Sequence, residues 1–345
     1  MGQLIFGPLS DRIGRRTILI ASTAVCAVAS AACVVAPDLP VLVGGRLVQG
    51  FAGAGGIVLG RAIIADTSDE RTAARAFSVL MTVGALAPVL APVLGGVVAV
   101  AGGWRGVFAV LTVVAVAMCV GAVVLLPESL PPARRDSAAW STTLRRAGRA
   151  LSRRRFIGST AVVVFSYGAL IADVSGSSFV LQEQYALTPA GYALAFAANA
   201  AGLTLASVAN ARLLRRAEPR RLLVLGLGVQ TVAAAVLVGC ALVGVLSTPL
   251  LLLLLWVGVT AVGFVVGNAT AAALAEAPRE RGTASAVVGA AQFALAAAIA
   301  PIAGTGSAVA MTSTMTVCAA VAVLTLALTV RAGRVAPEPS LTSDT

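Results

Sequence analysis

Residues 7–16 read GPLSDRIGRR, a short charged turn that contains two glycines. Only six residues precede it, whereas a helix needs about 20 residues to cross a bilayer. The residues that follow it, 17–37, contain no Asp, Glu, Lys or Arg. The turn therefore predicts the end of a partial N-terminal helix and the start of a complete membrane crossing.

The composition of the whole chain supports this interpretation. Of 345 residues, 59% are hydrophobic and 11% are charged, whereas soluble domains carry about 25% charged residues. Four stretches lack charge, namely 17–37, 106–127, 222–275 and 282–330. The first two can each hold one membrane helix and the last two can each hold two. No stretch alternates polar and apolar residues as a transmembrane strand would.

The chain is therefore predicted to be an all-α integral membrane protein with about ten complete transmembrane helices and a partial helix at 1–8. We place the complete helices near 17–36, 41–65, 76–100, 105–127, 156–181, 190–212, 222–245, 249–274, 283–303 and 307–330.

The basic residues predict the orientation in the membrane. All 25 are Arg. If the turn at Asp11 is cytoplasmic, the loops on the opposite side (37–40, 101–104, 182–189, 247–249 and 304–306) contain no Arg. This is the distribution of the positive-inside rule. We expect a multi-pass protein of a bacterial-type inner membrane, with the N-terminal turn, the central linker and the C-terminus in the cytoplasm. The net charge of +11 then reflects topology and attraction to anionic lipid, and no nucleic-acid partner is expected.

The longest polar interruption predicts the division into domains. It spans residues 128–155 and is rich in Arg. We expect an N-terminal bundle at 1–127, a basic cytoplasmic linker at 128–155, a C-terminal bundle at 156–332 and a cytoplasmic tail at 333–345. The linker reads as a basic amphipathic helix lying on the inner leaflet, with a solvated linker as the alternative.

Several kinds of chemistry are not expected. The five cysteines fall inside predicted helices without paired spacing and read as packing residues. There is no His, which removes the usual zinc sites and imidazole proton relays. The remaining acids and bases sit mostly in loops. We therefore expect no metal, no cofactor and no enzymatic activity.

Six motifs, in chain order, carry a resemblance to a known family. They are Gly7-x3-Asp11-Arg12-x-Gly14-Arg15-Arg16, Arg46-x2-Gln49-Gly50-x2-Gly53, Arg61-x4-Asp66, Ala87-Pro88-x2-Ala91-Pro92-x2-Gly95-Gly96, Ser177–Glu183 and Gly282–Ser285. Together they resemble the drug:proton antiporters of the major facilitator superfamily, in the bicyclomycin and chloramphenicol resistance subfamily. The resemblance covers residues 1–330 and implies two helical bundles that rock against each other. It also implies that the family's first helix and half of its second are missing before Met1.

The first motif, together with Asp66 of the third, implies an inner gate formed by Gly7, Asp11, Arg12, Gly14, Arg15, Arg16 and Asp66. The two glycines would allow close backbone approach. Asp11 would pair with a nearby Arg and face the positive end of another helix, such as the one that begins at Gly282. Asp66 would be a second partner for Arg12 or Arg15. The alternative is a solvated turn whose arginines only fix the topology.

Two residues are candidates for proton coupling. Arg46 shares a helix face with Gln49, and an Arg inside the membrane needs a cavity or a carboxylate partner. In the family reading it lowers the pKa of a nearby acid; a snorkelling structural Arg is the alternative. Asp173 is the only acid well inside a predicted helix, which makes it a functional candidate, although it could instead line a wet outer vestibule.

The fourth motif implies an antiporter kink at Gly84, Pro88, Pro92, Gly95 and Gly96. Proline bends a helix, and the glycines would pack tightly against the other bundle. The family adds a role in sealing the path against proton leak, whereas an ordinary kinked packing helix is the alternative.

The substrate cavity is expected near the membrane midplane between the bundles. Its candidate lining residues are Gln49, Tyr167, Asn199, Asn268 and Gln292. Buried amides also join helices through hydrogen bonds, so a structural role is open for each of them.

The predicted function is export of drug-like amphipathic small molecules in exchange for protons by alternating access. The expected partners are membrane lipid, the small-molecule substrate and protons, and the protein is expected to be a monomer. The alternatives are a truncated fragment that does not transport, a transporter of another small solute, and a membrane sensor that binds a ligand without moving it.

Overall fold

The computed structural model describes residues 2–67, 70–135, 139–278 and 281–334. This part of the chain is almost entirely helical and contains no β-strand, so the prediction of an all-α protein is confirmed. The elements are α1 (Gly2–Ile13), α2 (Arg15–Val34), α3 (Leu39–Thr67), α4 (Glu70–Leu125), η1 (Pro132–Arg134), α5 (Ala139–Leu151), α6 (Arg154–Phe179), η2 (Val180–Gln184), α7 (Pro189–Leu213), α8 (Pro219–Val243), α9 (Thr248–Ala275), α10 (Arg281–Ala303) and α11 (Ala308–Arg334).

Nine helical segments in the described part of the chain are long and apolar enough to cross a membrane. One of them, 94–125, includes a break in α4. Most of the predicted crossing at 76–100 falls on residues whose side chains lie outside the described part. The predicted tail at 333–345 also lies almost wholly outside it.

The chain divides into two compact units. The first contains Met1–Arg146 and Thr188–Ala200, and the second contains Ala147–Leu187 and Ala201–Thr345. We call them the N-terminal unit and the C-terminal unit and describe each by itself. The boundaries expected for the bundles, linker and tail stay a prediction.

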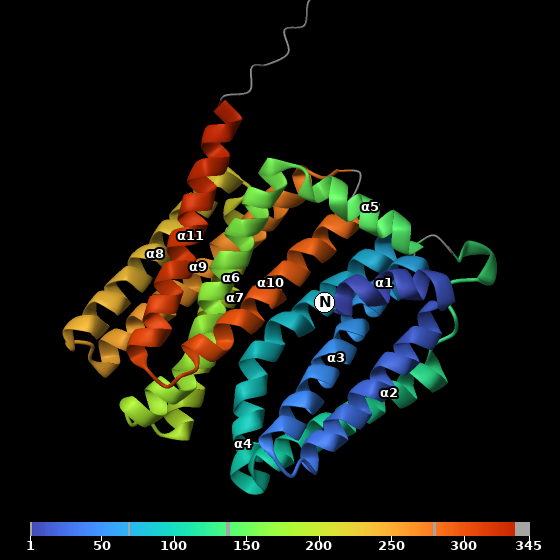
Figure 1. Cartoon of the computed structure of the whole chain (residues 1–345), viewed down its shortest axis with the longest axis horizontal. Helices are drawn as coiled ribbons and strands as arrows, with labels where there is room; N and C mark the ends of the chain where they lie inside the picture. The colour runs from blue at the N-terminus through green and yellow to red at the C-terminus, as the bar shows by residue number, and fades with distance from the viewer. Residues whose placement is uncertain (1, 68–69, 136–138, 279–280, 335–345) are drawn as a thin grey trace, which may run out of the picture. The chain divides into compact units, whose positions relative to one another are not determined.

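In the N-terminal unit, α2 packs against both α3 and α4, and α1 packs against α3. Its core contains Phe6, Ile18, Leu19, Leu59 and Ala122. Helix α4 is interrupted at Gly103, and Figure 1 shows that it consists of two segments that run in different directions. Gly103 has φ 62° and ψ −167°, a conformation available to glycine because it has no Cβ.

The charged turn at 7–16 is shorter than the sequence suggested. Helix α1 continues to Ile13 and α2 begins at Arg15, so one residue, Gly14, joins them. Gly14 has φ 125°, which an L side chain rarely adopts. The polar residues of the motif therefore belong to two helix ends and not to an open loop.

In the C-terminal unit, α6 packs against α9, α10 and α11, and α8 packs against α9 and α11. The core includes Phe156, Val163, Leu227, Val265, Ala273 and Ala322. Helix α5 covers much of the predicted basic linker helix, and its residue Ala150 is buried in this core.

Buried polar side chains in this unit bind one another. The Ser166 hydroxyl donates to Gln230 Oε1 at 2.7 Å, and Gln230 Nε2 donates to the Ser166 carbonyl at 3.0 Å. Asn268 Nδ2 donates to Asn210 Oδ1 at 2.8 Å. Because a polar group in hydrocarbon needs a partner inside the protein, these pairs join α6 to α8 and α7 to α9.

Two arginines connect α2 and the second half of α4 at opposite ends. Arg16 Nη2 donates to the Val123 carbonyl at 2.7 Å. Arg105 donates to the Val34 carbonyl at 3.2 Å and to the Ala36 carbonyl at 3.1 Å. Carbonyls at a helix C-terminus lack partners within the helix and attract cations. Each of the two neighbouring helices therefore supplies a cation for the C-terminal end of the other.

Arg105 directly follows the predicted arginine-free loop 101–104, so one arginine does stand at that end of the unit. Its guanidinium also lies 4.2 Å from the centre of the Trp104 ring. The carbonyls and the ring provide a structural reason for a cation at this position.

Replacement of Arg105 by alanine should loosen the C-terminal end of α2. Cys33, in the last turn of α2, has no exposed surface and serves as a reporter once the other four cysteines are replaced. Loss of two charge-assisted hydrogen bonds at a partly exposed site costs about 1 kcal/mol, so Cys33 should be alkylated about fivefold faster. Maleimide labelling followed by mass spectrometry measures this rate.

Arg61→Ala is the matched control. Arg61 is an exposed arginine of the same unit that makes no hydrogen bond or ion pair with the described residues. Equal labelling rates in the two variants would show that Arg105 does not hold α2.

Candidate functional site

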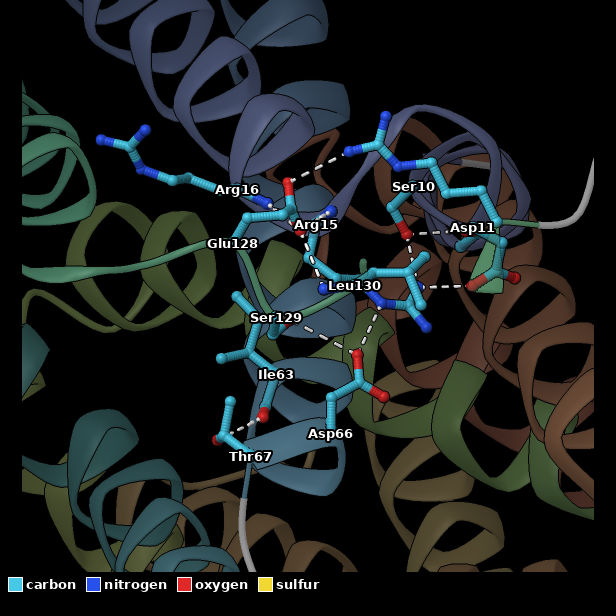
Figure 2. Close-up of polar contacts among 12 residues, drawn as sticks. Ser10, Asp11, Arg15, Arg16, Ile63, Asp66, Thr67, Glu128, Ser129 and Leu130 are labelled. Atoms are coloured by element: carbon cyan, nitrogen blue, oxygen red, sulfur yellow. Dashed lines mark hydrogen bonds and ion pairs between the residues drawn. The ribbon is translucent and has the colours of Figure 1, made fainter. Parts of the chain in front are cut away.

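The centre of the candidate site is Arg15, the first residue of α2 (Figure 2). Its guanidinium lies 2.6 Å from Asp11 Oδ1 and 3.0 Å from Asp66 Oδ2, and it donates to the Ser10 hydroxyl at 2.6 Å. The Arg15 side chain is only 13% exposed, whereas Asp11 is 40% exposed. One cation thus joins the end of α1 to the end of α3.

The sequence predicted Arg12 or Arg15 as a partner of Asp66, and in the structure the partner is Arg15. Arg12 is exposed and makes no hydrogen bond or ion pair with the described residues. Arg16 binds the Val123 carbonyl. The expected contact of Asp11 with the helix near Gly282 would join the two units and stays a prediction.

Glu128 belongs to this site although the sequence analysis did not single it out. Its Oε1 accepts hydrogen bonds from the backbone N–H groups of Arg15 at 2.9 Å, Arg16 at 3.5 Å and Leu130 at 3.0 Å. Gly14 precedes α2 and has no side chain to cap it. Glu128 supplies the missing acceptor at the positive end of the helix. The sequence does contain one signal for Glu128, because it is the first acidic residue after the charge-free stretch 106–127.

The pKa of Glu128 reflects opposing influences. Burial raises the pKa, but three backbone N–H donors and Arg135, which lies 4.0 Å from Oε2, outweigh burial and hold the pKa below the usual value of 4.5. Glu128 is therefore ionised at neutral pH and keeps its negative charge into the acidic range.

The two glycines of the motif differ. A Cβ on Gly14 would clash with Glu128 Oε2 and lie 2.9 Å from a guanidinium nitrogen of Arg135. A Cβ on Gly7 would meet only Val58, at 3.9 Å, which is ordinary van der Waals contact. Close approach to the backbone therefore occurs at Gly14, whereas within the N-terminal unit Gly7 has only this ordinary contact. The gate role expected of Gly7 stays a prediction.

Arg46 belongs to a second group of hydrogen-bonded side chains in the N-terminal unit. It donates to Gln49 Oε1 at 2.5 Å, and its guanidinium lies 5.5 Å from the centre of the Phe108 ring. Gln49 Nε2 in turn donates to the Ser30 hydroxyl at 2.6 Å, and both of these side chains are buried. In the described part of the chain, the polar partner of Arg46 is thus an amide and not a carboxylate.

Asp173 lies in α6 of the C-terminal unit and is 1% exposed. It is therefore inside the packed helices of this unit in the structure and not at a wet surface. Its role in proton coupling stays a prediction.

The predicted cavity residues are distributed over both units. Gln49 and Asn199 belong to the N-terminal unit, whereas Tyr167, Asn268 and Gln292 belong to the C-terminal unit. The Tyr167 ring makes an edge contact with Phe293, with centres 6.2 Å apart. A common cavity between the units stays a prediction.

The predicted antiporter kink lies in α4. The structure describes the backbone of Gly84, Pro88 and Pro92 as part of this helix but not the surroundings of these three residues. Nothing lies within 4 Å of a Cβ built on Gly95 or Gly96. The sequence predicts that these two glycines pack against the other bundle, and this contact also stays a prediction.

Comparison with known proteins agrees with this architecture. Residues 1–301 match the family model described as Major Facilitator Superfamily. An uncharacterized MFS-type transporter of Bacillus subtilis, YdgK, is 30% identical over 88% of this chain and 76% of its own length. A bicyclomycin resistance protein homolog of Haemophilus influenzae is 27% identical over 86% of this chain and 74% of its own length. The xylose transporter XylE from E. coli, in a partially occluded inward open conformation, has a TM-score of 0.65 and 15% identity, and the match covers 98% of this chain and 85% of XylE.

The helical fold and these matches define a membrane transporter and not an enzyme. The chain belongs to the major facilitator superfamily.

Replacement of Gly14 by alanine should strongly destabilise the N-terminal unit. The positive φ and the clash with Glu128 together cost about 2 kcal/mol or more, so thermal unfolding of the detergent-purified protein should shift to lower temperature by several degrees. Gly7→Ala is the matched control and should leave the unfolding temperature almost unchanged. Equal shifts in both variants would contradict the assigned role of Gly14.

The charge of Glu128 should contribute to stability in a pH-dependent way. Because the folded pKa is lowered, the contribution is present at neutral pH and is lost as pH falls through the folded pKa, below about 4.5. Glu128→Gln should unfold at a lower temperature than the wild type at pH 7, and this difference should shrink below pH 4. A difference that does not change between pH 7 and pH 3.5 would rule out the charge as its source.

Proposed function

We propose that this chain exports drug-like amphipathic small molecules in exchange for protons by alternating access, as a member of the bicyclomycin and chloramphenicol resistance subfamily. The observation that carries the proposal is Arg46. It is a cation within an apolar helix, and its contacts are an amide and an aromatic ring. Ionisable residues in membrane helices are costly and mark functional pathways.

The contacts of Arg46 suit a role in proton coupling. A carboxylate partner would cancel its charge, whereas Gln49 binds it without neutralising it. The positive charge therefore remains available to favour the ionised form of an acid that approaches it. Asp173 in the C-terminal unit is our candidate for a titrating acid because it is a buried carboxylate among apolar helices.

The cluster around Arg15 is our candidate for the inner gate. In this proposal it lies on the cytoplasmic side, together with the central linker and the C-terminus, in the inner membrane of a bacterial-type cell. Arg15 has two carboxylate partners, so Asp66 can retain it while the more exposed Asp11 changes its contacts. The transporter would function as a monomer.

The proposal predicts proton-dependent export that requires Arg46. In inverted vesicles with an imposed proton gradient, bicyclomycin, the compound in the name of one relative, should accumulate, and a protonophore should abolish accumulation. Arg46→Gln should lower the rate at least tenfold because it removes the charge and keeps a hydrogen-bonding side chain. Labelled bicyclomycin measures export, and an acridine dye measures the release of protons that accompanies it.

Two results would count against the proposal. Accumulation that persists with a protonophore would exclude proton exchange. Unchanged proton-dependent export by Arg46→Gln would remove Arg46 from the mechanism. Asp173→Asn tests the candidate acid separately, because it should abolish the proton signal while ligand binding by the detergent-purified protein is retained.

A further inference from the structure

The C-terminal unit contains a cavity of about 730 Å³, and one predicted substrate-cavity residue, Asn268, lines it. It lies between α6, α8, α9 and α11, at the beginning of α6 and α8 and the end of α9 and α11. Its lining includes Arg155, Ser159, Arg220, Asn268, Glu276 and Thr329. A volume of this size accommodates a drug-sized molecule or part of a lipid.

The wall of this cavity is mainly apolar. Val162, Leu223 and Ala269 line it and are almost fully buried. Helix α9 adds Ala271 and Ala275, which are exposed. The short alanine side chains leave room beside the helix, and such a surface suits a hydrocarbon chain.

The polar residues of the cavity include two available cations. Arg155 and Arg220 both line it, and neither makes a hydrogen bond or an ion pair with the described residues. The nearby Arg221, in contrast, pairs with Glu218 at 3.3 Å. The cavity thus offers two uncommitted guanidinium groups beside an apolar wall.

The charge balance at the cavity favours an anion. The Glu218 carboxylate also lines it, but Arg221 already neutralises this acid. Glu276 adds one negative charge against the two positive charges of Arg155 and Arg220. With Arg221 counted beside the lining residues, three arginines face two acids and leave one net positive charge. Guanidinium groups bind phosphate oxygens well.

We propose that this cavity binds an anionic phospholipid of the membrane. The phosphate lies between Arg155 and Arg220, the Ser159 hydroxyl donates to a headgroup oxygen, and one acyl chain covers the alanine surface of α9. A free phosphate ion would use the arginines but would leave the apolar wall uncovered. Basic pockets between membrane helices are known binding places for anionic lipid headgroups.

A lipid bound here touches α6, α8, α9 and α11 at one end of the unit. It should therefore stabilise the C-terminal unit in proportion to its occupancy, because a ligand that binds the folded state shifts unfolding by mass action.

The test uses the full chain in nanodiscs of dioleoylphosphatidylcholine with increasing dioleoylphosphatidylglycerol. Native mass spectrometry should detect one retained phosphatidylglycerol per chain, and the unfolding temperature should rise with its fraction. The double variant Arg155→Gln with Arg220→Gln should retain at least tenfold less of this lipid and lose the thermal shift.

Arg215→Gln with Arg216→Gln is the matched control, since it removes the same charge from exposed residues near the start of α8 that do not line the cavity. It should retain the lipid. An equal loss in both double variants would show general surface attraction and overturn the proposal.

Two further measurements separate lipid from free phosphate. Ala272→Leu places a larger side chain in the apolar wall and narrows the cavity without changing its charge. It should therefore weaken retention of phosphatidylglycerol. Inorganic phosphate at 10 mM should not replace the lipid or raise the unfolding temperature. If phosphate alone reproduces the shift and Ala272→Leu has no effect, the site is a phosphate site and the lipid assignment is wrong.

Discussion

The ends of α2 need partners from outside the helix, and the N-terminal unit is organised around supplying them. Gly14 leaves the N-terminal amides without a side-chain cap, and Glu128 accepts from them. At the other end, Arg105 donates to the carbonyls that the helix leaves free. Such groups would otherwise be costly near a membrane because few alternative partners are available. A helix held at both ends provides a fixed base for the charged side chains of its first turn.

The capping of α2 also explains how Arg15 can serve the candidate gate. Its backbone N–H is bound by Glu128, so its position is fixed through the main chain. Its guanidinium is then directed to Asp11 and Asp66. Ser129, next to Glu128, donates to Asp66 at 3.4 Å. The segment that follows α4 therefore contacts the first turn of α2 through Glu128 and the Asp66 carboxylate through Ser129. Because this segment begins the connection between the two units, it links the proposed gate to that connection.

The sequence predicted most of the helical crossings because they follow from charge-free stretches. It also singled out Asp11, Arg15 and Asp66, which the structure brings together, because these residues belong to short motifs. It did not predict Glu128 or Arg105. Their partners lie 113 and 71 residues away, and a pairing over that distance has no periodic signal. The extent of α1 was also misjudged. Gly and polar residues suggested an open turn, yet Gly14 alone changes the chain direction, so the residues before it remain helical.

Arg46 illustrates why a cation in a membrane helix should be judged by the charge of its partners. A salt bridge to a carboxylate would form a neutral pair whose field falls off quickly, and its removal would act mainly on stability. Hydrogen bonding to Gln49 and contact with the Phe108 ring satisfy the guanidinium while leaving its charge uncompensated. The low dielectric of a helical bundle lets such a charge act over a longer distance than in water. In the proposed mechanism, the amide partner thus leaves Arg46 able to influence an acid that it does not contact.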